Sequence, residues 1–259
     1  MNTIYYLAEG NVETLSSMFQ SWRSSSDFSP EFEKFEEFLG SGLSVSLNMK
    51  LDSLYKFLLE GEYKNIYELY AGDYDTLEKN DPLFFYRFSF DTSFENGTSF
   101  QYGAVNAGNL GTVFWGDFCV YLEIPKDTVI LKYNSLSVEP SGKYRYFDKD
   151  KDVNLGKLQM DLGFLQDAAQ LVLLKNKKNQ LIDISANYYK ELVCDGEDYV
   201  EVIIEPKINL SDIRKVWFNP EIYEEETRKQ FESEDDQQDS IVAVIEEMEK
   251  NRIPWEIYQ

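Results

Sequence analysis

The sequence contains no histidine among its 259 residues. This absence excludes a Ser-His-Asp or Cys-His catalytic unit, a zinc site with histidine ligands and an imidazole general base. The two cysteines, Cys119 and Cys194, are too few for a thiolate metal site or a disulfide framework, and we expect both to be reduced and partly buried in strands. Any catalysis must rest on carboxylates, hydroxyls, arginine or lysine side chains, backbone groups or a cofactor. We expect no metal.

Long apolar runs are also missing. No run approaches the roughly 18 apolar residues that a membrane-spanning helix needs. The first residues lack the basic and apolar regions of a secretion signal. We therefore expect a soluble, cytoplasmic protein without membrane association, although a toxin delivered into a cell would show the same pattern.

Basic residues are scarce, with 25 Lys and Arg against 47 Asp and Glu, a formal net charge of −22. This charge repels nucleic acid and anionic lipid over the surface as a whole, but it does not exclude a local basic cleft. It favours a partner with a basic face. The 43% hydrophobic and 15% aromatic content is ample for a packed core and argues against a disordered chain.

The order of the expected elements predicts an α+β protein in three regions. Residues 1–80 show helical patterns, and we expect them to pack on the core. Residues 81–218 are predicted to form a mixed, mostly β core, and residues 219–259 an acidic helical tail. Capping residues and apolar spacing predict the helices of the first region at 29–40, 52–61 and 64–70.

Within the core, alternation and aromatic density predict strands. We expect them at 84–90, 116–124, 127–133, 181–185, 199–204 and 215–218, with a hairpin around Ser141-Gly142 and a helix at 157–174. In the tail we expect two helices joined by the acidic run 232–236, which is typical of a solvated linker.

Arg87 and Ser89 lie in an aromatic run that should be buried. A guanidinium in such a run needs an anionic partner, because an unpaired buried charge is very costly. That partner is either a ligand phosphate or one of the many carboxylates of the protein.

A glycine- and asparagine-rich stretch, residues 101–111, leads into an apolar strand that begins near Trp115. Its glycines permit positive φ angles and close approach of the backbone to a ligand. It is not a phosphate-binding loop, because no Lys-Ser/Thr pair follows and it leads to a strand. Taken alone, an ordinary glycine-rich connection is the favoured interpretation.

Glu201 lies inside an apolar strand, where alternation puts it on one face with Tyr199 and Ile203. A carboxylate in this setting is expensive unless it has a partner or a function. The simpler alternatives are an exposed strand face or a structural carboxylate paired with a cation.

Taken together and in this order, the three segments resemble ADP-ribosyltransferase-like toxin domains. The matching pattern is the Arg87 strand, the stretch Tyr102-Gly-Ala-Val-Asn106 feeding Trp115-Gly-Asp-Phe-Cys-Val-Tyr-Leu122, and Tyr199-Val-Glu201 followed by Leu210-Ser-Asp-Ile213. The resemblance spans about residues 65–218, and the first 60 and last 40 residues carry none.

The resemblance implies a split β-sandwich that holds NAD, as substrate, in a cleft between two sheets. It implies that Arg87 binds the NAD phosphates and ribose, and that Glu201 holds the ribose and stabilises the oxocarbenium charge of the transition state. Tyr102, Phe100 or Trp115 is expected to stack on the nicotinamide. The implied catalytic residues are Glu201, Arg87 and Tyr102, and the implied NAD contacts are Arg87, Ser89, Tyr102, Asn106, Trp115 and Tyr199. Arg87 and Glu201 should therefore line one cleft.

Two positions depart from the family pattern. The middle motif has three candidates, Thr92-Ser93, Thr98-Ser99 and Tyr102, and the residue two before Glu201 is Tyr199 rather than Glu or Gln. The second departure argues against arginine as the acceptor and leaves another amino acid, a nucleotide base or a small molecule.

The leading hypothesis is a toxin or anti-phage effector that transfers ADP-ribose from NAD to a macromolecule, protein or nucleic acid, and that is restrained by a cognate antitoxin or regulator. NAD glycohydrolysis on the same fold is included in it. The alternative is a non-enzymatic acidic interaction protein, such as an inhibitor, immunity protein or antitoxin, that binds a basic partner. Its supporting features are the net charge and the Glu-rich helical ends.

Overall fold

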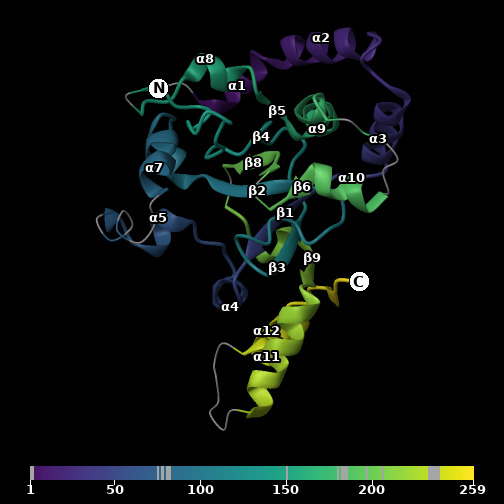
Figure 1. Ribbon diagram of the computed structural model, residues 1–259. Coiled ribbons are helices and arrows are strands. Elements are labelled where there is room, and N and C mark those ends of the chain that lie inside the picture. Colours follow the sequence, from purple (N-terminus) through teal and green to yellow (C-terminus); the bar gives the residue numbers. More distant parts are fainter. Residues whose placement is uncertain are drawn as a thin grey trace.

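The computed structural model describes residues 3–74, 76, 79, 83–149, 151–179, 181, 186–196, 198–205, 207–232 and 240–259. Its centre is one open, eight-stranded mixed sheet in the order β10-β9-β3-β1-β2-β8-β4-β5 (Figure 1). The strands are β1 Ser44–Met49, β2 Gln101–Asn106, β3 Phe118–Leu122, β4 Val129–Leu131, β5 Leu162–Phe164, β8 Glu201–Ile204, β9 Ile213–Phe218 and β10 Trp255–Ile257, with β6 Cys194–Asp195 and β7 Asp198–Tyr199 forming a separate pair. All neighbours are antiparallel except β9 and β10.

Helices pack around this sheet. They are α1 Ile4–Glu9, α2 Val12–Arg23, α3 Pro30–Gly40, α4 Leu51–Glu60, α5 Ile66–Leu69, α7 Phe84–Thr92, α8 Leu155–Gln159, α9 Ala168–Asn176, α10 Ala186–Val193, α11 Pro220–Glu232 and α12 Ile241–Lys250. The chain is thus a mixed α and β protein, as the sequence predicts at this coarse level.

The prediction that residues 1–80 are helical is wrong at the centre of the molecule. The segment Ser44–Met49 is β1, which pairs with both β2 and β3. Its apolar residues Val45, Leu47 and Met49 alternate with polar ones, and this period of two is the pattern of a strand with two different faces. The first region therefore supplies an internal strand of the main sheet.

The predicted strand at 84–90 is also wrong, because Phe84–Thr92 is helix α7. Its aromatic residues follow helical as well as alternating spacing, with Phe84 packed on Phe88 and Phe90 packed on Phe94. The helix places Arg87 four residues before Asp91, so both side chains lie on one face.

The predicted helix at 157–174 is interrupted. Helix α8 ends at Gln159, β5 follows, and α9 begins only at Ala168. Gly163, in the middle of β5, packs so closely that an added Cβ would lie 2.9 Å from Leu171 Cδ1. The short strand brings the chain onto the edge of the sheet beside β4.

The other expected elements are found with small changes of boundary. Helices α3, α4 and α5 and strands β3, β4 and β8 lie within the predicted ranges or one residue from them. Strand β9 begins two residues before its predicted range, and Gly142 forms the tip of the predicted hairpin. Of the expected strand at 181–185, only Leu181 is described, without regular structure, and the rest lies outside the described residues, as do residues 233–236 of the acidic run. Strand β10, beyond the two tail helices, was not expected.

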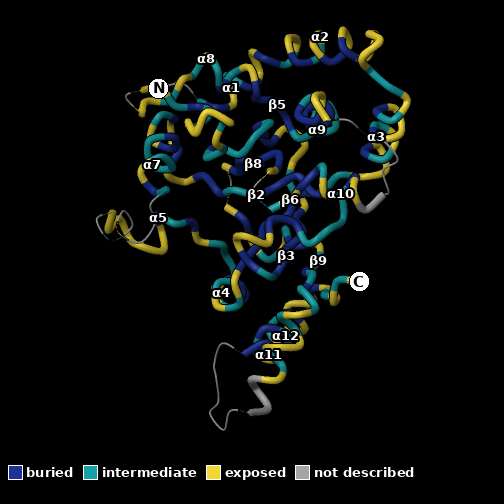
Figure 2. The backbone as a smooth tube through the Cα atoms, viewed as in Figure 1, coloured by how far each residue is buried: buried dark blue, intermediate teal, exposed yellow. Residues whose placement is uncertain are grey.

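The strands at the centre of the fold are largely buried (Figure 2), and the two faces of the sheet contribute to different hydrophobic clusters. One face carries alternate residues such as Val202 and Ile204 and packs with α2, α3, α4, α9 and α12 into the larger hydrophobic cluster. The other face carries Ile203 and packs with α1, α7 and α8 into a smaller, more aromatic cluster. Between β3 and β8 this second face is polar, because Ser46, Asn48 and Glu201 are buried on it.

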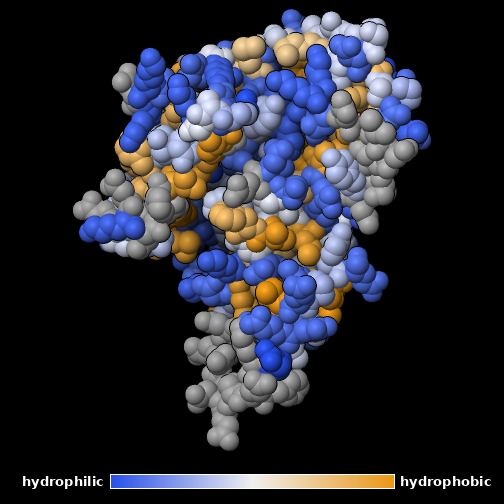
Figure 3. All heavy atoms as spheres, in the orientation of Figure 1, coloured by the Kyte–Doolittle hydropathy of each residue, from blue (hydrophilic) through white to orange (hydrophobic). Residues whose placement is uncertain are grey.

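Helices α11 and α12 project together beyond β9 (Figure 1). Helix α12 packs its buried residues Ile241, Val244 and Met248 into the larger cluster. The face shown in Figure 3 is mainly hydrophilic, with hydrophobic residues gathered near its middle. None of the described helices is long and apolar enough to cross a membrane.

Candidate functional site

A cavity of about 620 Å³ opens beside the polar face of the sheet. Its size is that of a ligand pocket, which commonly measures about 300–1,000 Å³. Strands β1 and β2, helices α4, α5 and α7, and the chain around Glu201 form its walls. The polar and aromatic residues that line it include Arg87, Asp91, Tyr102, Trp115, Tyr199 and Glu201.

Glu201 is fully buried on β8, between Ala104 of β2 and Leu131 of β4. Its Oε1 lies 3.3 Å from Nη2 of Arg87, and its Oε2 accepts the backbone N–H of Ser135 at 2.9 Å. These two contacts fix the carboxylate. They use only part of its acceptor capacity, since a carboxylate offers about four lone-pair sites.

Arg87 reaches the cavity from α7, and its side chain is 14% exposed. Its Cζ lies 3.7 Å from the centroid of the Tyr102 ring, a cation–π contact. Burial disfavours its charge, but Glu201, Tyr102 and Asp91 together raise the pKa of Arg87 above its ordinary value. Its Nη1 is buried and donates no hydrogen bond to any residue that the structure describes.

Asp91, which the sequence analysis does not single out, lies beside this pair. It is fully buried, and its Oδ2 accepts the Tyr67 hydroxyl at 2.6 Å while its Oδ1 accepts the Tyr102 hydroxyl. Burial raises the pKa of Asp91 to about 7, against the opposing effect of Arg87 and of the two hydroxyl donors. The four-residue spacing from Arg87 is a sequence signal for it, but only once this segment is assigned as a helix.

The five residues Tyr67, Arg87, Asp91, Tyr102 and Glu201 thus form one connected group, here called the buried network. Burial raises the pKa of Tyr67 and of Tyr102 far above the ordinary tyrosine value. Both hydroxyls therefore stay protonated and act as donors to Asp91. The members come from α5, α7, β2 and β8, so the site exists only in the folded chain.

The glycine-rich stretch after β2 folds back on the sheet instead of cradling a ligand. Asn48 donates to the carbonyls of Leu110 and Gly116, and it accepts from the backbone N–H and hydroxyl of Thr112. Gly111 has a φ of 69°, and a Cβ there would lie 2.4 Å from Asn48 Oδ1. Gly111 and Gly103 thus permit close packing within the protein, since a Cβ at Gly103 would lie 2.9 Å from the Ser46 carbonyl oxygen.

Two of the expected NAD contacts lie outside the cavity lining. Asn106 is fully buried, donates to Ser46 Oγ and accepts the backbone N–H groups of Gly108 and Asn109, so it orders the loop. Ser89 donates to the Lys151 carbonyl. Trp115 and Tyr199, by contrast, line the cavity, as does Phe100.

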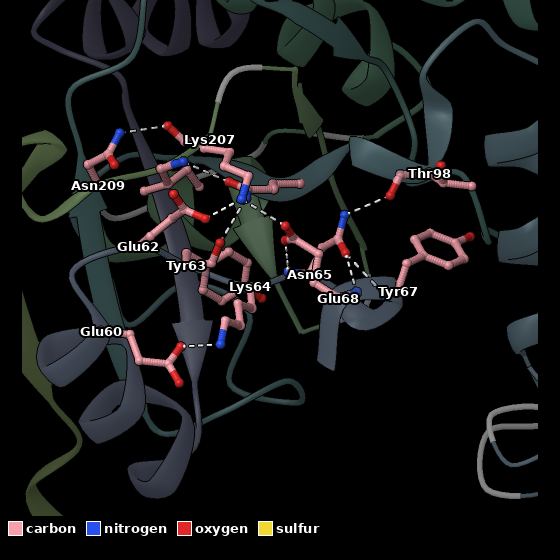
Figure 4. A network of polar contacts seen from close by, with 12 residues as sticks. Glu60, Glu62, Tyr63, Lys64, Asn65, Tyr67, Glu68, Thr98, Lys207 and Asn209 are labelled. Carbon is pink, nitrogen blue, oxygen red and sulfur yellow. Dashed lines mark hydrogen bonds and ion pairs between the residues drawn. The ribbon is translucent and has the colours of Figure 1, made fainter. Parts of the chain in front are cut away.

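Residues 60–70 form a further wall of the cavity and are tied firmly to the sheet (Figure 4). Asn65 caps α5 and donates to the carbonyls of Thr98 and Phe100. Lys207 forms ion pairs with Glu62 and Glu68. This wall carries Tyr67, so the same contacts also hold one end of the buried network.

Lysines lie on the α4 side of the cavity. Lys50, Lys56 and Lys64 line it, with Lys64 paired to Glu60 at 2.8 Å. Lys50 and Lys56 are exposed. The acidic residues Asp52, Glu60 and Glu62 line the same side of the cavity, so its rim carries charges of both signs.

Within the described part of the chain, no group of three or more Cys, Asp or Glu side chains is arranged to hold a metal ion. No protein-family model matches the sequence, and no curated protein matches it significantly. The geometry of the cavity is therefore the main indication of function.

Proposed function

We propose that the protein is a cytoplasmic, NAD-dependent ADP-ribosyltransferase of toxin or anti-phage effector type, although its cavity lies beside one continuous eight-stranded sheet and not between the two sheets of a split β-sandwich. The observation that carries the proposal is the position of Arg87 and Glu201. They are 114 residues apart in sequence, yet they meet at 3.3 Å in the wall of one ligand-sized cavity. The sequence resemblance pairs the same two residues.

The alternative, a purely structural ion pair between Arg87 and Glu201, does not explain why one donor of Arg87 lacks a described partner. A buried pair is worth its desolvation cost only where hydrogen bonds satisfy the remaining donors and acceptors. Here Arg87 Nη1 is buried without a partner among the described residues. The guanidinium as a whole lines the cavity and is 14% exposed, so its accessible part is suited to a ligand oxygen.

The residues present fit a dinucleotide. Arg87 lines the cavity with a partly exposed guanidinium, and Lys50 and Lys56 supply positive charge for phosphates at the rim. Tyr102, Tyr199 and Trp115 supply aromatic surface for planar rings. Glu201 has acceptor capacity left for ribose hydroxyls, but its side chain is 0% exposed, so the proposal requires the wall around it to move when NAD binds.

As substrate, NAD supplies a glycosidic bond whose cleavage builds positive charge on the ribose. A carboxylate that is already fixed stabilises such charge without reorganisation. Arg87 and the Ser135 N–H hold Glu201 in place for this role.

The acceptor in this proposal is a macromolecule, protein or nucleic acid, and a cognate antitoxin or regulator restrains the enzyme. Tyr199 occupies the position two residues before Glu201 and lines the cavity with 7% exposure. A phenol there cannot serve as the carboxylate or amide that would orient an arginine acceptor. The acceptor is therefore a different amino acid or a nucleotide base.

The test is incubation of the protein with a cell lysate and two forms of NAD, labelled in the nicotinamide or in the adenosine. We expect release of labelled nicotinamide together with adenosine label on a macromolecule. Nicotinamide release without macromolecular label would define a glycohydrolase. If neither label moves while the protein captures a basic partner, the proposal is wrong and the acidic interaction protein is the better account.

A further inference from the structure

Asp91 is the buried acid of the cavity to which neither the sequence pattern nor the proposed chemistry assigns a function. It is fully buried one helical turn after Arg87. An ionised carboxylate in this position needs hydrogen bonds to offset the cost of its burial. The Tyr67 and Tyr102 hydroxyls provide them.

The contacts of Asp91 determine where the Tyr102 ring lies. The Tyr102 hydroxyl donates to Asp91, and the face of the same ring lies 3.7 Å from Arg87 Cζ. Arg87 in turn contacts Glu201 at 3.3 Å. Apart from this hydroxyl contact, the described interactions of the Tyr102 ring are the cation–π contact with Arg87 and an edge contact with Phe100.

Tyr67 fixes the other side of Asp91. Its hydroxyl donates to Oδ2 at 2.6 Å, and its backbone N–H is capped by Asn65, which belongs to the rigid wall in Figure 4. The carboxylate is therefore held between a wall residue and a strand residue. Rotation of Asp91 would break one of the two contacts.

We propose that Asp91 is a positioning residue of this site: by accepting the Tyr67 and Tyr102 hydroxyls together, it holds the Tyr102 ring against Arg87 and so sets the guanidinium beside Glu201. Its consequence for turnover rests on the proposed use of NAD. The positioning itself does not, because it concerns groups that are present without substrate.

The arrangement depends on the charge of Asp91. The titratable groups that face it are Arg87 on its own helix, Tyr67 on α5, Tyr102 on β2 and Glu201 on β8. Protonation takes one acceptor site from the carboxyl group and removes its attraction to Arg87. Because its pKa is raised to about 7, the ionised form predominates only above about pH 7. Lower pH should therefore release Tyr102 and Arg87.

The first experiment follows the Arg87 Nε–H signal by nuclear magnetic resonance between about pH 5.5 and 8.5, roughly 1.5 units on either side of 7. The signal is identified by its loss in Arg87→Lys. In the wild-type protein we expect it to shift with a midpoint near the Asp91 pKa of about 7. In Asp91→Asn we expect no such transition. An unchanged transition in Asp91→Asn would overturn the proposal.

The second experiment measures nicotinamide release from NAD over the same pH range. We expect the wild-type rate to fall below about pH 7. Asp91→Asn should lower kcat/KM roughly 10- to 100-fold at high pH, as expected for a lost hydrogen bond to a charged group, and should flatten the pH profile. The double variant Asp91→Asn/Tyr102→Phe should be little worse than the poorer single variant, because both remove the same contact.

Tyr67→Phe keeps the protein measurable if Asp91→Asn does not fold. It removes one donor from Asp91 and should shift the Arg87 transition to higher pH, since a carboxylate with fewer donors binds its proton more tightly. Absence of a shift contradicts the proposal. If the Arg87 transitions behave as expected but NAD is not turned over, the positioning stands and the proposed function fails. If Asp91→Asn turns over NAD with the pH profile of the wild type, the proposed function stands and the positioning role of Asp91 fails.

Discussion

Glu201→Gln should reduce nicotinamide release from NAD roughly 100- to 1,000-fold, the usual cost of removing a preorganised electrostatic group. The substitution keeps the shape of the side chain and its contact with the Ser135 N–H, but it removes the negative charge. The fold should persist, because Arg87 keeps its contact with the Tyr102 ring and its attraction to Asp91. Steady-state rates of the purified variant, with circular dichroism to verify folding, provide the measurement.

The matched control is Glu205→Gln. Glu205 directly follows the same strand, and its substitution is the same chemical change. Its side chain is exposed and does not line the cavity. We expect its turnover to equal that of the wild type. Full activity in Glu201→Gln would refute the assignment of Glu201, and equal losses in both variants would point to an effect of net charge.

Arg87→Met should destabilise the folded protein by about 3–5 kcal/mol, the range found when one partner of a buried ion pair is removed. The methionine fills much of the space of the arginine stem, so lost packing is a small part of the effect. The main cost comes from Glu201, which is fully buried and would lose the cation that compensates its charge. Urea-induced unfolding followed by fluorescence measures the free energy of unfolding.

The double variant Arg87→Met/Glu201→Gln separates charge from packing. It removes both charges, so most of the lost stability should return, although the variant should remain inactive toward NAD. If Arg87→Met is as stable as the wild type, Glu201 is not an uncompensated charge in that variant. If the double variant is no more stable than Arg87→Met, the loss comes from packing.

Alternation along a strand carried the most reliable information in the sequence. It placed Glu201 on one face with Ile203, and the structure confirms this arrangement, with Val202 and Ile204 in the opposite core. The expectation that Arg87 and Glu201 line one cleft is also confirmed. Their roles stay predictions.

The secondary structure around Arg87 could not be settled in the same way. A run of seven residues with five aromatic side chains satisfies both periods, and aromatic residues favour strands by propensity. The helix prevails because its aromatic residues pack against α5 and against the turn after α7. The same error hid Asp91, whose relation to Arg87 depends on helical spacing.

Other features depend on partners distant in sequence. β1 is an internal strand because β2 and β3, more than 50 residues later, pair with both of its edges. Asn48 orders the loop near Trp115 through contacts about 64 residues away. Local composition contains no record of these pairings. The same holds for β10 at the end of the chain, because its pairing with β9 is what defines it as a strand.

The most direct test of the account is calorimetric titration of NAD into Glu201→Gln, a variant that should bind the dinucleotide without consuming it. We predict one site per chain, with binding much weakened when Arg87→Met is added. Binding that is indifferent to Arg87, or no binding at millimolar NAD (on the order of the weakest typical substrate affinities), would contradict the claim that this cavity is an NAD site.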